Sequence, residues 1–326
     1  MRIAIVGAGA IGGWLAARLA QTSAEVCVLA RGRTLEAIKH NGLVLTENGK
    51  TVVARIHASD RPESLGEQDL VIVAVKGHAL AGVAPAIARL LGPDTAVLPA
   101  MNGVGWWFSQ GLGGTLDGMA MSAVDPDGTI ARHIPPSRVI GCAVHASSSV
   151  AEPGQIAHTH GNRLIIGEPN GRESTRLARA ADALRAAGLD VTISRRIQQD
   201  VWYKLWGNMT MNPISALTCA TGDLILGDAL VTTLILSVMA EAKEVGARIG
   251  CLIAESGEDR MAVTRRLGRF KTSMLQDVEA GRALEIDALL AAPREIAQKA
   301  GVATPHMDAL HGLIRLFDAV RQEARR

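Results

Sequence analysis

Three glycines, Gly7, Gly9 and Gly12, directly follow the first apolar run of the chain. That run, Arg2–Val6, is short, which predicts a buried strand, and apolar residues at helical spacing follow the glycines. In a strand–turn–helix of this kind the first glycine permits a tight turn, the second lets the backbone approach a ligand, and the third allows close helix–strand packing. The N–H groups that open the helix can then bind a pyrophosphate. The expected cofactor-binding residues of this turn are Gly7, Gly9, Ala10, Ile11 and Gly12.

Strands and helices alternate in the first half of the chain. Short apolar runs rich in β-branched residues occupy residues 25–30, 69–75 and 95–99, and helix-like segments separate them. A later helix is expected to end at Gly188, with an alternating strand after it. This alternation predicts a parallel sheet covered by helices on both faces. We therefore expect an N-terminal α/β domain with a Rossmann-type doubly wound parallel sheet over residues 1–196.

The sequence changes character after that expected boundary. From Gln198 onward apolar residues recur at helical spacing, β-branched runs are rare, and Gly and Pro mark the turns. Thr304 followed by Pro305 is typical of a helix start, with a capping hydroxyl and a proline at the first helical position. The second domain, residues 197–326, is therefore predicted to be all helical.

Length and composition narrow the class of protein. The 326 residues suffice for two packed domains, and 48% apolar with 20% charged residues is a globular composition. A formal charge of +2 and an aromatic content of 3% argue against nucleic acid or an anionic membrane as a partner. Four scattered cysteines suit a reducing compartment, so we expect a cytoplasmic protein. His158 and His160 lack a third ligand, so no metal site is expected.

The residues after the second expected strand indicate which dinucleotide binds. Sites for NAD usually carry Asp or Glu there, to bind the ribose 2′-hydroxyl, whereas this chain has Arg31-Gly32-Arg33. Two arginines suit a 2′-phosphate, which predicts NADPH. Lys76 ends another strand at the same edge and could contact that phosphate, although ordinary surface cations remain the alternative for all three side chains.

Lys204, Asn208 and Asn212 are spaced by four residues, so on a helix they lie along one face. Their apolar neighbours include Trp202 and Trp206, which predicts partly buried surroundings. Buried amides need partners, and either a structural polar network or a ligand can supply them.

Reduction of a ketone needs a hydride donor at the carbonyl carbon and a proton source at its oxygen. A partly buried lysine suits the second role, because desolvation lowers the pKa of an ammonium. A nearby carboxylate would hold that ammonium in place. Glu285, Asp287 and Glu295 are candidates, and sequence spacing alone does not choose among them.

Several motifs together resemble the ketopantoate reductase family over essentially the full chain. The resemblance implies that Lys204 is the general acid and that Glu285 engages both this lysine and the substrate. It also implies that Asn208 and Asn212 bind substrate oxygens, that Ser273 meets the carboxylate, and that Asn102 lies beside the lysine and the nicotinamide. The matching pieces are Gly7–Gly12, Lys76, Asn102-Gly103, the segment from Trp202 to Pro213, Ser273, Glu285-Ile-Asp287 and Thr304-Pro305.

The implied activity is NADPH-dependent reduction of 2-dehydropantoate to pantoate. Alternatives are a reductase of another branched or aromatic 2-keto acid, a β-hydroxyacid dehydrogenase, and a non-catalytic NADPH-sensing regulator. A homodimer is a further expectation.

The chain departs from the family pattern at two places. Met101 stands where the family usually has Gln, and the segment of about residues 104–136 is longer by about twenty residues. Trp106, Trp107 and Phe108 open this segment. We hypothesise that it caps the substrate cleft or forms an oligomer interface.

Overall fold

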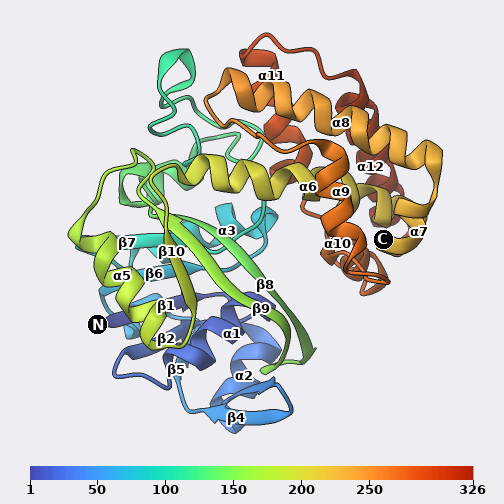
Figure 1. Ribbon diagram of the computed structural model, residues 1–326. Helices are drawn as coiled ribbons and strands as arrows, with labels where there is room; N and C mark the ends of the chain where they lie inside the picture. The colour runs from blue at the N-terminus through green and yellow to red at the C-terminus, as the bar shows by residue number, and fades with distance from the viewer. Residues whose placement is uncertain (326) are drawn as a thin grey trace. The chain divides into compact units, whose positions relative to one another are not determined.

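The computed structural model describes residues 1–325, which form two compact units (Figure 1). The first unit consists of Met1–Met101, Trp106–Gly111 and Asp127–Ile197. The second consists of Asn102–Gly105, Leu112–Pro126 and the chain from Gln198 onward. Two short pieces from the first half of the sequence therefore belong to the mainly C-terminal unit, whereas a division at residue 196 assigns them to the N-terminal domain.

The first unit contains a parallel sheet with the strand order β5-β2-β1-β6-β7. Its central strand, β1, is buried from Ile3 to Val6, as expected when helices cover both faces of a sheet. The strands expected near residues 2–6, 25–30, 69–75 and 95–99 are confirmed. The strands of this sheet are β1 (Arg2–Val6), β2 (Glu25–Leu29), β5 (His57–Ser59), β6 (Gln68–Val73) and β7 (Leu91–Pro99).

A second, mixed sheet in the same unit was not predicted. Its order is β10-β9-β3-β4, and β8 pairs with β9. Asn48 and Gly49, both with positive φ, form the turn between β3 and β4, as in a two-residue hairpin. Helix α1 contacts β8 and β9, so the helix that follows the glycines packs on both sheets. The strands are β3 (Leu43–Glu47), β4 (Lys50–Ala54), β8 (Gly141–Glu152), β9 (Gln155–Gly167) and β10 (Asp190–Ile193).

A serine cap and a glycine mark the two ends of helix α5 in the first unit. The Ser174 hydroxyl accepts a hydrogen bond from the Leu177 N–H over 3.1 Å and caps α5. Gly188, at φ 74°, follows the end of α5 and leads into β10, as predicted. The helices are α1 (Ala10–Leu19), α2 (Gly32–Asn41), α3 (Gly77–Ala88), α4 (Thr129–His133) and α5 (Thr175–Ala186).

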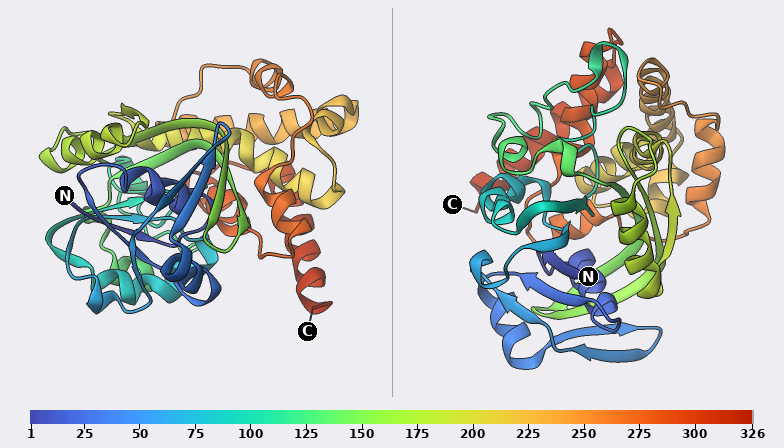
Figure 2. Two further views of the ribbon diagram at one scale, coloured as in Figure 1. Left: turned by 90° about the horizontal axis from the view of Figure 1, so that it is seen from below. Right: turned by 90° about the vertical axis from the view of Figure 1, so that its left-hand side faces the viewer.

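The second unit is built from helices, as predicted (Figure 2). Thr304 occupies the N-cap position of α12, but its hydroxyl donates to the Asp308 carboxylate over 3.2 Å. The helix begins at Pro305 as predicted, but the predicted hydroxyl cap is wrong, because Thr304 has φ −132° and ψ 57°, outside the extended conformation usual for a capping residue. Within residues 1–325 no helix is long and apolar enough to cross a membrane. The helices are α6 (Ile197–Thr218), α7 (Gly222–Gly227), α8 (Ala229–Arg248), α9 (Gly257–Arg265), α10 (Ser273–Glu279), α11 (Ala292–Lys299) and α12 (Pro305–Glu323).

The aromatic side chains that open the long segment are buried. Trp106, Trp107 and Phe108 are at most 4% exposed. The Trp106 indole donates to the Ile134 carbonyl over 2.9 Å, and Trp107 packs so closely on Gly141 that a Cβ there would meet its ring at 2.5 Å. These aromatic residues are core of the first unit, so they do not supply the ligand-capping or subunit-binding surface hypothesised for this segment.

Candidate functional site

The glycine turn at the end of β1 combines two tight contacts with one open position. A Cβ on Gly7, which has φ +89°, would lie 2.7 Å from Val75 Cγ1, and a Cβ on Gly12 would lie 1.9 Å from the Gly7 carbonyl oxygen. A Cβ on Gly9 would meet nothing within 4 Å. Packing therefore requires the outer two glycines, whereas the middle one borders open space that a ligand can approach.

The first turn of α1 presents backbone donors without a competing side chain. Gly9 is the N-cap and forms no side-chain cap, and no acidic residue occupies the first turn, where Ala10 and Ile11 lie. The partial positive charge of this helix end favours an anion. The turn therefore fits the pyrophosphate of a dinucleotide, and its N–H groups would hold it.

The predicted phosphate-binding cations follow the two strands that flank β1. β1 pairs with β2 on one side and β6 on the other. Arg31 is the N-cap of α2 just after β2, and Lys76 is the N-cap of α3 just after β6. Arg31 and Arg33 are exposed, and Lys76 is half-buried. Parallel strands end at one edge, so these cations lie at the same edge of the sheet as the glycine turn.

In the second unit, two buried tryptophans fix the helix that carries Lys204. The indole N–H groups of Trp202 and Trp206 donate to the carbonyls of Ala242 and Met239, over 3.0 and 2.7 Å. The half-buried Lys204 then donates from Nζ to Asn102 Oδ1 over 2.8 Å. Two of the predicted site residues, 102 positions apart, are thus brought together in this unit.

Asn212 and Ser273 form a second pair of predicted site residues, further along the same face of α6. Asn212 is 5% exposed, and its Nδ2 lies 3.5 Å from Ser273 Oγ, to which it donates. Ser273 is exposed at the start of α10, which the Thr272 hydroxyl caps. Asn208 is half-buried between Lys204 and Asn212 on α6. Amide and hydroxyl groups at such positions can bind the oxygens of a small acid.

The three candidate carboxylates have different surroundings in the structure. Glu295 accepts the backbone N–H groups of Ser122 and Ala123, over 3.0 and 2.8 Å, so it holds a loop of the second unit. Asp287 is exposed, whereas Glu285 is half-buried, two residues before the π-helical turn Asp287–Ala291. The engagement of Lys204 by Glu285 stays a prediction.

Sequence reasoning missed the environment of Gly103. This residue has φ +76°, and its Cα lies against the backbone of Ala288. The Asn-Gly pair was a usable indication of a positive φ, but nothing in the sequence identifies Ala288 as its neighbour.

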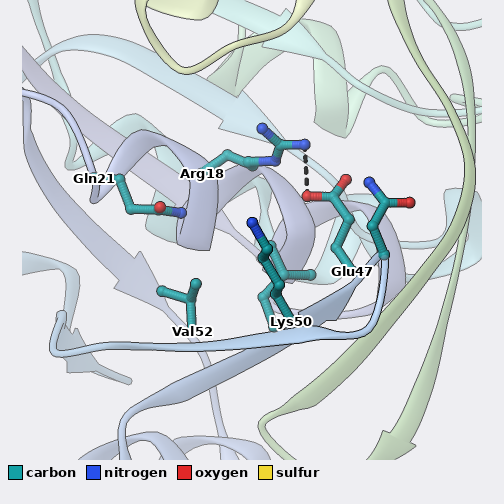
Figure 3. Close-up of a pocket in the computed structure, with 7 residues that line it drawn as sticks. Arg18, Gln21, Glu47, Lys50 and Val52 are labelled. Atoms are coloured by element: carbon teal, nitrogen blue, oxygen red, sulfur yellow. Dashed lines mark ion pairs between the residues drawn. The ribbon is translucent and has the colours of Figure 1, made fainter.

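A groove of about 330 Å³ lies elsewhere on the first unit, between α1 and the β3–β4 hairpin (Figure 3). Arg18 and Glu47 form an ion pair there over 2.5 Å, and Glu47 also lies 3.4 Å from Nε2 of His158. The predicted site residues, all within the described chain, lie outside the groove. The residues that line it are Arg18, Gln21, Leu45, Glu47, Asn48, Lys50 and Val52.

Comparison with known proteins matches both units to one family. Residues 3–107 match the family model described as ketopantoate reductase PanE/ApbA, and residues 196–318 match its C-terminal counterpart. A 2-dehydropantoate 2-reductase from Mesorhizobium japonicum is 43% identical over 97% of both chains.

Solved structures share the fold over the whole chain. A crystal structure from Ralstonia solanacearum, which carries a provisional ketopantoate reductase assignment, is 55% identical, with a TM-score of 0.95 over 98% of both chains. A ternary structure of D-mandelate dehydrogenase with NADH and anilino(oxo)acetate shares the fold at 23% identity, with a TM-score of 0.83 over 99% of both chains. The chain belongs to the ketopantoate reductase family, whose members are NAD(P)-dependent oxidoreductases acting on CH–OH groups.

Proposed function

We propose that this protein reduces 2-dehydropantoate to pantoate with NADPH, and that Lys204 is the general acid. The dinucleotide supplies a hydride to the carbonyl carbon. Lys204 gives a proton to the carbonyl oxygen, and water returns the proton to the amine. The observation that carries the proposal is the hydrogen bond from Lys204 Nζ to Asn102 Oδ1, since it holds an ammonium in a fixed direction on a rigid helix.

The polar residues of α6 and α10 have complementary roles in this proposal. Ser273, which lies 3.5 Å from Asn212, binds the substrate carboxylate, and Asn208 and Asn212 bind hydroxyl or carbonyl oxygens of the substrate. Glu285 orients Lys204. The name of the Mesorhizobium relative, 43% identical, supports 2-dehydropantoate as the substrate.

NADPH rather than NADH is proposed from charge. Arg31 and Lys76 follow the strands on either side of the glycine strand, and no acidic residue lies in the first turn of α1 or α2. Such cations attract the 2′-phosphate that distinguishes NADPH. We also propose a cytoplasmic location, because four cysteines scattered along the sequence, without paired spacing, suit a reducing compartment. The homodimer stays a prediction that sedimentation velocity can test.

The test is oxidation of NADPH by the purified protein with 2-dehydropantoate, beside a panel of branched and aromatic 2-keto acids. Lys204→Ala is expected to lower kcat by about 100-fold or more, because the proton donor is lost. Lys299→Ala, an exposed lysine on α11, is the matched control and should leave kcat unchanged.

Each other outcome points to a named alternative. Turnover of a different keto acid alone would keep the mechanism and replace the substrate. Binding of NADPH without turnover of any keto acid would favour the sensing regulator.

A further inference from the structure

The π-helical turn Asp287–Ala291 leaves one backbone carbonyl without its usual donor. The Ala292 N–H donates to the Asp287 carbonyl five residues earlier, which is the π-helical spacing. The next donor in that register would be residue 293, but Pro293 has no N–H. The Ala288 carbonyl therefore has no partner within the turn.

A distant segment supplies the missing donor. The Val104 N–H donates to the Ala288 carbonyl over 2.9 Å. Val104 belongs to Asn102–Gly105, the short piece of chain that joins the helical unit. The proline thus creates an acceptor on the turn, and the segment that carries Asn102 occupies it.

Gly103 makes this approach sterically feasible. A Cβ at this position would lie 2.4 Å from the Ala288 oxygen and 2.6 Å from its carbonyl carbon, distances that real side chains do not adopt. Its φ of +76° is also unfavourable for residues with a side chain. The clash is with backbone, so no side-chain movement relieves it.

We propose that Gly103 and Pro293 are positioning residues that set Asn102 against Lys204. Residue 103 lies flat on Ala288, residue 104 is hydrogen-bonded to it, and residue 102 is thereby directed to accept from Lys204 Nζ at 2.8 Å. The proposal rests on the proposed function only in assigning the proton transfer to Lys204. The contact with Ala288 is independent of that assignment.

Gly103→Ala is the principal test, with Gly113→Ala as its control. Gly113 has φ +78°, nearly that of Gly103, but a Cβ there would meet nothing within 4 Å, so it shares the positive φ without the clash. Gly103→Ala should lower kcat by about 10- to 100-fold with little change in the KM for NADPH, because displacement by about 1 Å impairs catalysis more than binding. The hydride-transfer isotope effect with deuterated NADPH should rise. The Gly113→Ala control should change neither kcat nor the isotope effect.

A double-mutant cycle separates positioning from general destabilisation. If Gly103 acts through Asn102, the Gly103→Ala change should cost little further activity in an Asn102→Ala background. Full additivity of the two losses would overturn the proposal. Pro293→Ala restores an N–H that competes for the Ala288 carbonyl, and a smaller loss of kcat is expected.

A crystal structure of the Gly103→Ala variant tests the geometry without substrate. Retention of the Lys204–Asn102 hydrogen bond at its native length would contradict the positioning role, whatever the reaction. Failure of the wild-type protein to reduce any keto acid would instead contradict the proposed function, and this measurement keeps the two failures distinguishable.

Discussion

The imidazole of His158 stacks on the indole of Trp14, with ring centroids 4.9 Å apart and 5° between the planes. Ser148 Oγ lies 3.0 Å from its Nδ1, and Glu47 lies near its Nε2. Burial lowers the pKa of His158 below its ordinary value, and the neighbouring Glu47 only partly opposes this effect. The contact joins β9 to α1, the helix that begins at the glycine turn.

This lowered pKa predicts a loss of stability in mild acid. Below about pH 6.5 the unfolded chain protonates this histidine while the folded chain does not, so the unfolded state binds more protons and the free energy of unfolding falls. Urea unfolding between pH 7.5 and about 5.5 should show this fall, and His158→Gln should flatten it. His57→Gln, at an exposed position, is the control. An unchanged pH slope in His158→Gln would assign the loss to other groups.

The geometry of the glycine turn predicts that one substitution weakens NADPH binding and that another destabilises the protein. Gly9→Ala should leave the thermal midpoint nearly unchanged, since a Cβ there meets nothing within 4 Å, but it should weaken NADPH binding at least about tenfold by blocking the pyrophosphate. Gly12→Ala should destabilise the protein itself, because its Cβ would lie 1.9 Å from the Gly7 oxygen. Calorimetry measures the thermal midpoint and fluorescence titration measures the NADPH affinity, with Gly82→Ala on α3 as the control. Equal affinity in Gly9→Ala would mean that the dinucleotide does not approach this position.

Replacing Arg31 should change the choice between the two nicotinamide dinucleotides. Arg31→Gln is expected to raise the KM for NADPH by about tenfold or more and leave the KM for NADH nearly constant, because only NADPH carries the 2′-phosphate. Lys39→Gln, an exposed cation on α2, controls for the general change in charge. Parallel increases for both cofactors would contradict a phosphate-specific contact.

Trp106 should matter for stability and not for substrate preference. Trp106→Phe leaves the Ile134 carbonyl without its donor and is expected to lower the free energy of unfolding by about 1–3 kcal/mol. The ratio of kcat/KM values across a panel of 2-keto acids should stay constant. Thr115→Val, at an exposed position in the same segment, is the control. A changed preference with native stability would restore the substrate-capping hypothesis.

The sequence predicted the parallel sheet because buried parallel strands are nearly continuous apolar runs, as in β1 and β6. It did not reveal the second sheet. Its long strand β8 contains three consecutive serines, which is not the composition of a buried strand, and β4 is a short, mostly exposed strand of five residues. Both strands contact α1, and no pattern within either strand predicts that contact.

The shared helix of three predicted site residues could be read from their spacing. Lys204, Asn208 and Asn212 lie on α6 as their period of four indicates. Family resemblance was needed to connect Asn102 with Lys204, because no local pattern relates positions 102 residues apart. The role of Ala288 depends on a carbonyl freed by Pro293, and such a backbone effect is visible only once the turn is known to be π-helical.

The interleaving of the two units limits how this enzyme can be divided or recombined. A fragment beginning at Gln198 would carry Lys204 but neither Asn102 nor the loop that Glu295 holds, since both come from the first half of the chain. Exchange of the C-terminal half between relatives would therefore join a lysine from one parent to an asparagine from the other. The unit of inheritance is the whole chain, and swapping its halves as modules would require transplanting residues 102–105 and 112–126 with the helices.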